Sequence, residues 1–98
     1  MTIQKNLQGS TLTIAPEGRL DTITSPQFES ELRADMNTVT DLVLDLANLT
    51  YISSAGLRVI LSAQKVMSKK GTMVLRNVRP EIMEIFEITG FSSFLTIE

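Results

Sequence analysis

The residues of this chain whose type and placement favour chemistry are two adjacent serines, Ser53 and Ser54. They stand between an apolar strand pattern at 42–46 and a helical pattern with apolar residues at Leu57, Ile60, Leu61 and Met67. Because the first N–H groups of a helix have no acceptor within it, a serine at this joint is expected to cap the helix. We predict that Ser54 is the N-cap and that residues 55–57 form the first turn. The same position would tolerate a phosphate, since free N–H groups and the helix dipole favour an anion.

From spacing alone, the simplest interpretation of Ser54 is a helix cap with no further role. A resemblance to a known family adds a second interpretation, a phosphate acceptor. The segment 51–57, Tyr-Ile-Ser-Ser-Ala-Gly-Leu, together with 18–21, Gly-Arg-Leu-Asp, resembles the STAS domain, the family of bacterial anti-sigma-factor antagonists. The resemblance covers nearly the whole chain, from the strand near Leu12 to a helix that ends at Gly90. The serine loop is its specific part.

The resemblance implies a small cytoplasmic switch protein. Unmodified, such a protein binds an anti-sigma factor and releases the sigma factor. The anti-sigma factor is also a serine kinase, and by the family pattern its acceptor is Ser54. A serine phosphatase is the further partner that the resemblance implies.

The resemblance also supplies candidate partner-binding residues: Asp21, Ser53, Ser54, Gly56 and Leu57. The family often has an Asp immediately before the acceptor, and here Ser53 takes that place. This departure leaves the kinase open and provides a second hydroxyl as an alternative acceptor. Asp21 has two interpretations, a turn or capping residue and a residue near the phosphorylated loop.

A second function class remains beside the switch. Single STAS domains also serve as accessory subunits of lipid transporters or of larger signalling complexes, where Ser54 would be only a structural helix cap. An enzyme is not expected, because no general base, nucleophile partner or cofactor loop can be assembled. We therefore expect no catalytic residue and no cofactor.

The amino-acid composition excludes several kinds of site and of partner. The chain has 98 residues, enough for one domain at 1–98, with no Cys and no His, which excludes disulfides, thiolate or imidazole zinc sites and a Ser-His triad. Its net charge of -2 and its lack of a dense basic run disfavour nucleic acid and direct membrane contact. The five glycines are isolated, so no nucleotide-binding loop is present. A metal site formed by Asp21, Asp41 and Asp45 is disfavoured, since the predicted elements separate them.

Local patterns predict the elements that position the serines. Residues 2–8 and 10–15 read as a hairpin, 42–46 and 72–76 as strands, and 94–97 as a short last strand. A first helix is expected to open at Ser25-Pro26, with serine as cap and proline at the first helical position. A second helix, at about 55–69, is expected to end at Gly71 in the left-handed conformation, and a third to run from Pro80 to Gly90.

Alternation of strands and helices predicts an α/β fold, because parallel neighbours need right-handed crossovers. The expected sheet is mixed and mostly parallel, with four or five strands and an antiparallel edge from the hairpin. Polar Asp45 lies within the apolar strand at 42–46, so one face of the sheet should be only partly covered. Helices are therefore expected mainly on the other face.

Overall fold

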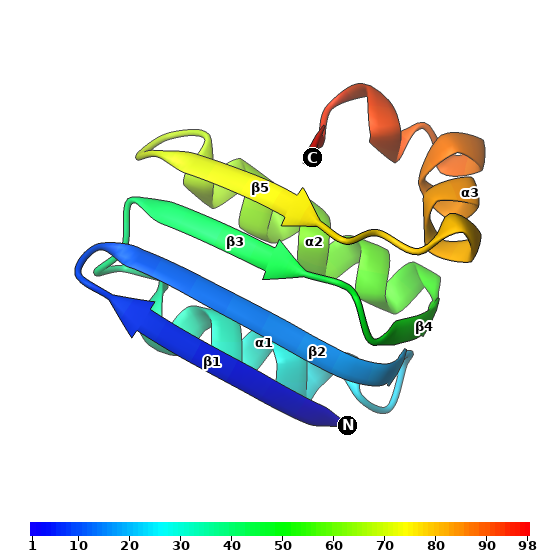
Figure 1. Cartoon of the computed structure of the whole chain (residues 1–98), viewed down its shortest axis with the longest axis horizontal. Coiled ribbons are helices and arrows are strands. Elements are labelled where there is room, and N and C mark those ends of the chain that lie inside the picture. The colour runs from blue at the N-terminus through cyan, green and yellow to red at the C-terminus, as the bar shows by residue number, and fades with distance from the viewer.

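The fold is built on one mixed sheet and three helices, and the computed structural model describes all 98 residues (Figure 1). In chain order the elements are β1 (Thr2–Gln8), β2 (Thr11–Leu20), α1 (Ser25–Met36), β3 (Asp41–Asp45), β4 (Leu49–Ile52), α2 (Ser54–Met67), β5 (Thr72–Arg76), α3 (Pro80–Thr89), a 3-10 turn (Phe91–Ser93) and β6 (Thr96–Ile97). The predicted hairpin, the strand at 72–76 and the third helix are confirmed.

The sheet has six strands, one more than the upper end of the predicted range, in the order β1-β2-β3-β5-β6 with β4 paired to the far end of β2. Only β1 is antiparallel to its neighbour, which confirms the mixed, mostly parallel sheet. We did not predict β4, because its four residues bury only the two at its ends and show no alternation. Gly18 lies at an irregularity of this pairing, because its φ is 99° and the register of the β2–β4 ladder shifts between Gly18 and Arg19.

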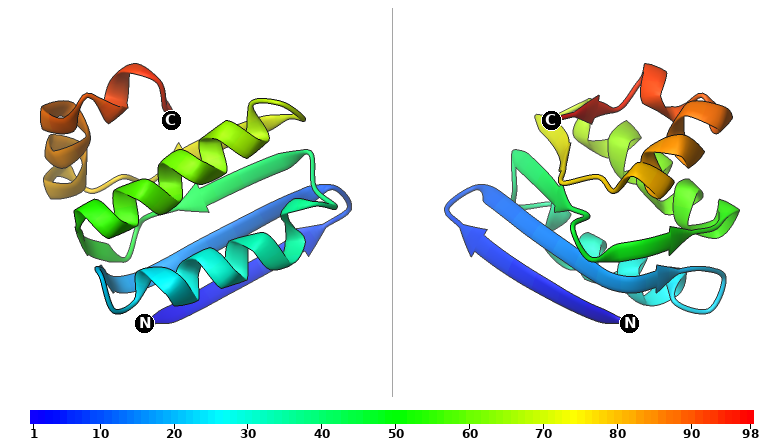
Figure 2. Two further views of the ribbon diagram at one scale, coloured as in Figure 1. Left: turned by 180° about the vertical axis from the view of Figure 1, so that it is seen from behind. Right: turned by 45° about the vertical axis from the view of Figure 1, so that its right-hand side comes forward.

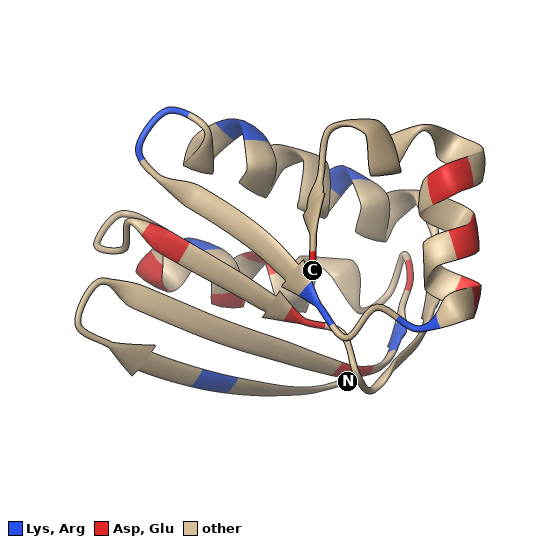
Figure 3. Cartoon of the chain, turned by 45° about the horizontal axis from the view of Figure 1, so that its top comes forward, with Lys and Arg blue, Asp and Glu red and all other residues tan.

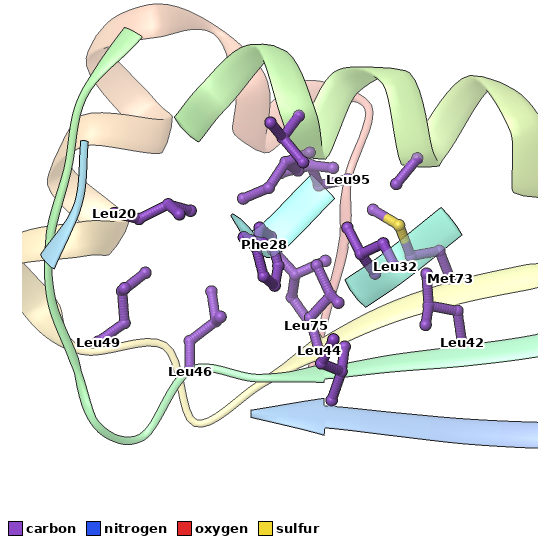
Figure 4. Close-up of a cluster of buried hydrophobic side chains, with 14 of the residues drawn as sticks. Leu20, Phe28, Leu32, Leu42, Leu44, Leu46, Leu49, Met73, Leu75 and Leu95 are labelled. Atoms are coloured by element: carbon purple, nitrogen blue, oxygen red, sulfur yellow. The ribbon is translucent and has the colours of Figure 1, made fainter. Parts of the chain in front are cut away.

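Helices α1 and α2 lie on one face of the sheet, and α3 packs beside β4 at its end (Figure 2). The prediction of helices mainly on one face is therefore confirmed. Along β3, Leu42 and Leu44 point into the core, whereas Asp45 on the opposite face is only half buried, as the alternation predicted. The core fills the space between the helices and the sheet (Figure 4), and its fully buried large side chains include Phe28, Leu32, Leu42, Leu44, Leu46, Leu49 and Phe86.

Both predicted N-caps are wrong by one residue. In α1 the N-cap is Thr24, and Ser25 is already helical and buried. In α2 the N-cap is Ser53, whose carbonyl accepts the first helical bond from the Leu57 N–H at 3.0 Å. The reason is tertiary: the Ser53 N–H donates to the Leu20 carbonyl at 2.9 Å, which holds Ser53 extended and lets the helix begin at Ser54.

The predicted role of Gly71 is also wrong. Helix α2 ends at Met67, its C-cap Ser68 is right-handed, and Gly71 has no positive φ. Glycine is needed there for space, because a Cβ would lie 1.7 Å from the Thr40 carbonyl oxygen. Gly90 does end α3 in the left-handed conformation, at φ 81°.

Candidate functional site

The serine pair and the loop after β2 meet at the same end of the sheet. Leu20 pairs with Ile52 in the parallel β2–β4 ladder, and the bond from the Ser53 N–H to the Leu20 carbonyl extends this ladder. Asp21 directly follows Leu20, so the structure brings it beside Ser53. This follows a general property of parallel sheets, in which the carboxyl ends of the strands and the loops after them share one edge.

The two serines differ in accessibility. Ser54 is exposed at the first position of α2, whereas the Ser53 hydroxyl oxygen is buried and has no hydrogen-bond partner. Neither hydroxyl makes a side-chain cap bond to the helix, and no backbone carbonyl accepts from the N–H groups of Ser54, Ala55 or Gly56. Three unpaired donors and the positive end of a 14-residue helix therefore lie next to an accessible hydroxyl.

Asp21 organises the turn between β2 and α1. Its Oδ1 accepts from the backbone N–H of Ile23 at 3.0 Å and of Thr24 at 3.1 Å. The Thr24 hydroxyl in turn donates to the Arg19 carbonyl at 2.8 Å and accepts from the Asp21 N–H at 2.9 Å. The backbone bond from Thr24 is the main cause that lowers the pKa of Asp21, with smaller contributions from Ile23 and Arg19. The interpretation of Asp21 as a turn residue is confirmed, and its contact with a partner stays a prediction.

Gly56 and Leu57 are buried beneath the serine loop. A Cβ on Gly56 would lie 2.8 Å from both Ile52 Cγ1 and Leu20 Cγ. Glycine therefore lets the first turn of α2 press against the ends of β2 and β4, and Leu57 anchors that turn in the core. Both residues fix the position of Ser54, and a direct partner contact by either stays a prediction.

Three surface residues of this region were not among the predicted site residues. The Arg19 guanidinium carbon lies 4.1 Å from the centre of the Tyr51 ring, a cation–π contact across the β2–β4 pair. Ile23, at the tip of the Asp21 turn, is 87% exposed, the most exposed large apolar side chain of the chain. The pairing of Arg19 with Tyr51 could be read from the sequence only once β4 was known. The exposure of Ile23 carries no sequence signal.

Charges are divided between helices α2 and α3 (Figure 3). Helix α2 has basic residues and no acidic one, whereas α3 carries Glu81, Glu84 and Glu87 on its exposed side.

No group of three or more potential ligands is close enough to hold a metal ion. None of the helices combines the length and the apolar character that a membrane crossing requires.

A comparison with known protein families places the chain in one of them. The model of the STAS domain matches residues 2–98, which is nearly the whole sequence. The chain belongs to the STAS domain family. The resemblance seen in the serine loop is thereby confirmed.

Relatives and solved structures agree with this assignment. BtrV of Bordetella bronchiseptica, which is named as an anti-sigma factor antagonist, is 40% identical over 83 residues, 83% of this chain and 72% of BtrV. The anti-sigma-B factor antagonist of Bacillus subtilis is 27% identical over 81 residues, 82% of this chain and 74% of that relative.

Two solved structures of the anti-sigma factor antagonist SpoIIAA share the fold. Its unphosphorylated form superposes with a TM-score of 0.84 at 19% identity, covering 99% of this chain and 88% of that one. The phosphorylated form of the Bacillus protein gives 0.77 at 19% identity, covering 99% and 91%. At this identity the likeness is one of fold.

Proposed function

We propose that this chain is an anti-sigma factor antagonist that acts in the cytoplasm and is switched by phosphorylation of Ser54. In its unmodified form it binds an anti-sigma factor and so releases a sigma factor. The same partner, acting as a serine kinase, transfers the γ-phosphate of ATP to the Ser54 oxygen and ends the binding, and a serine phosphatase restores the first form. The names of the relatives support the antagonist role.

The observation that carries the choice of Ser54 is the difference in accessibility between the two hydroxyls. A kinase must bring the acceptor oxygen in line with the γ-phosphate of ATP. The acceptor hydroxyl therefore has to be accessible on the protein surface. Ser54 is exposed, whereas the Ser53 hydroxyl oxygen is buried. This favours Ser54 and weakens the alternative that Ser53 accepts the phosphate.

The domain itself should tolerate the modification. A phosphate adds about -1.5 to -2 charges at neutral pH. At Ser54 it would meet the unpaired N–H groups of the first turn and the positive end of the α2 dipole. We therefore expect phosphorylation to leave the fold intact.

A partner docked over the loop would not tolerate it. The exposed surface of the β2–β4 end of the sheet includes Ile23 and the stacked pair Arg19 and Tyr51, which together offer apolar and cationic contacts. A partner that covers them must strip water from the phosphate or face it with its own carboxylates. A penalty of about 3 kcal/mol would weaken binding more than a hundredfold. In this scheme the chain is a binding module and a kinase substrate, and it contributes no catalytic group.

The test is a phosphorylation assay with the candidate anti-sigma factor, chosen as an ATPase-like kinase encoded beside this chain, followed by mass spectrometry. We expect one phosphate on the wild type, none on Ser54→Ala and one on Ser53→Ala. Because the two variants differ by one position in the same loop, they control for general damage to it. Modification that survives Ser54→Ala and disappears with Ser53→Ala would contradict the assignment. A transporter operon in place of the kinase gene would favour the accessory role.

A further inference from the structure

We propose that the Arg58 guanidinium forms an ion pair with the phosphate on Ser54 of the same chain. Phosphorylation then also neutralises a cation on the surface that the anti-sigma factor contacts. The inference rests on the proposed function, because it presupposes that Ser54 is the modified residue. It concerns what the modification does within this chain, before any partner is present.

The helix places the two side chains together. Ser54 and Arg58 are four residues apart in α2, and both are exposed. Side chains at this spacing lie one above the other on a helix surface, with their Cβ atoms about 5 to 6 Å apart. Helical side chains also lean toward the N-terminus, so Arg58 is expected to extend over the turn that contains Ser54. Its long side chain can reach a phosphate there without a change in the backbone.

Arg58 is also the one arginine with no carboxylate to bind. The other four each form an ion pair: Arg19 with Asp21, Arg33 with Glu29, Arg76 with Glu98 and Arg79 with Glu81. No ion pair of the chain involves Arg58, and α2 contains no acidic residue that could compete. Its guanidinium is therefore available, and its planar fork of donors matches the oxygens of a phosphate.

Pairing would change the docking surface in two ways at once. Before modification, the surface offers a hydroxyl and a free cation one turn apart. After modification, the phosphate adds negative charge and the guanidinium is bound to it, so an acidic group of the partner that contacted Arg58 would lose its counterpart. The anion is also held close to α2, over the unpaired N–H groups of the first turn.

The test measures the phosphate itself and needs no kinase. Phosphoserine is incorporated at position 54 during synthesis, and the second pKa of the phosphate is followed by phosphorus NMR in the wild type, Arg58→Gln and Lys65→Gln at about 0.15 M salt. Lys65→Gln is the matched control because it removes the same charge from another exposed position of the same helix. It lies 11 residues from Ser54, about 16 Å along the axis, which exceeds the screening length of about 8 Å.

We expect Arg58→Gln to raise the phosphate pKa by about half a unit or more, since an opposite charge at contact stabilises the dianion. Lys65→Gln should leave the pKa as in the wild type. Circular dichroism should show that both variants are folded. Equal pKa values in the wild type and Arg58→Gln would overturn the proposal.

A separate calorimetric titration distinguishes this proposal from the proposed function. The phosphate pKa could depend on Arg58 while the anti-sigma factor binds the phosphorylated and unmodified chains equally. That result would support the ion pair and contradict the phosphorylation switch. If phosphorylation abolishes binding while Arg58→Gln leaves the phosphate pKa unchanged, the switch stands and the ion pair fails.

Discussion

Gly56→Ala tests whether the close approach of α2 to the sheet requires a glycine at this position. The added methyl would lie 2.8 Å from Ile52 Cγ1, 2.8 Å from Leu20 Cγ and 3.0 Å from Leu20 Cδ2. Ordinary carbon contacts are about 3.5 to 4.0 Å, so the start of α2 or its two neighbours must move by about 0.5 to 1 Å. Both neighbours are themselves buried, which leaves little room for that movement.

The expected magnitude is the difference of two opposing effects. Overpacking of a core costs about 1 to 3 kcal/mol. Alanine in place of glycine inside a helix contributes about 1 kcal/mol in the other direction. We therefore expect Gly56→Ala to lower the free energy of unfolding by about 1 kcal/mol, which for a domain of this size lowers the melting temperature by about 4 to 8 °C.

The assay is urea denaturation followed by circular dichroism, on a double-mutant cycle with Leu20→Ala. Two of the three close atoms belong to Leu20, so in the Leu20→Ala background the methyl should cost less and its effect should be neutral or stabilising. A higher midpoint for Gly56→Ala in the wild-type background would refute the reasoning. It would mean that helix propensity alone governs this position.

Three further predictions concern stability. Ser54→Ala should change the free energy of unfolding by less than about 0.5 kcal/mol, and Ser53→Ala should be neutral or stabilising, because neither hydroxyl bonds to the helix and that of Ser53 is buried without a partner; urea midpoints measure both. Asp21→Ala should destabilise at pH 7, and because the pKa of Asp21 is lowered in the folded chain, the difference should shrink as pH falls below the ordinary value of 3.8. Lys5 forms ion pairs with Asp35 and Glu31 of α1, and the bond to Asp35 is the main cause that raises the pKa of Lys5. The wild type should therefore be more stable than Lys5→Met, with the full difference in free energy of unfolding below pH 10.5 and a decline above it. Thermal melts at a series of pH values measure this difference.

The sequence allowed most of the fold to be predicted where local pattern and tertiary environment agree. Alternation along 42–46 predicted a sheet with one open face, and the proline and glycine at the two ends of α3 predicted its bounds. The errors of prediction arise where contacts with a segment distant in sequence determine the local structure. Strand β4 exists because the end of β2 pairs with it, and Gly71 is needed because Thr40 lies against it.

In the candidate site, too, some features could be predicted from the sequence and others depend on tertiary contacts. The meeting of Asp21 with the serine loop could be expected, because both follow strands that end at one edge of the sheet. Which serine is exposed could not, since the extended backbone of Ser53 depends on its bond to Leu20. Residues with no sequence signal, such as the exposed Ile23, become visible only in the folded chain.

The most direct test of the central claim is a calorimetric titration of the cognate anti-sigma factor with the unmodified chain and with the chain carrying phosphoserine at position 54. The account predicts that the phosphorylated chain keeps its circular dichroism spectrum and binds at least about a hundredfold more weakly, a penalty of about 3 kcal/mol. Ser54→Ala should bind like the unmodified chain and should not be released by ATP. Equal affinity of the phosphorylated and unmodified chains would contradict the account and leave Ser54 as the exposed first residue of a helix.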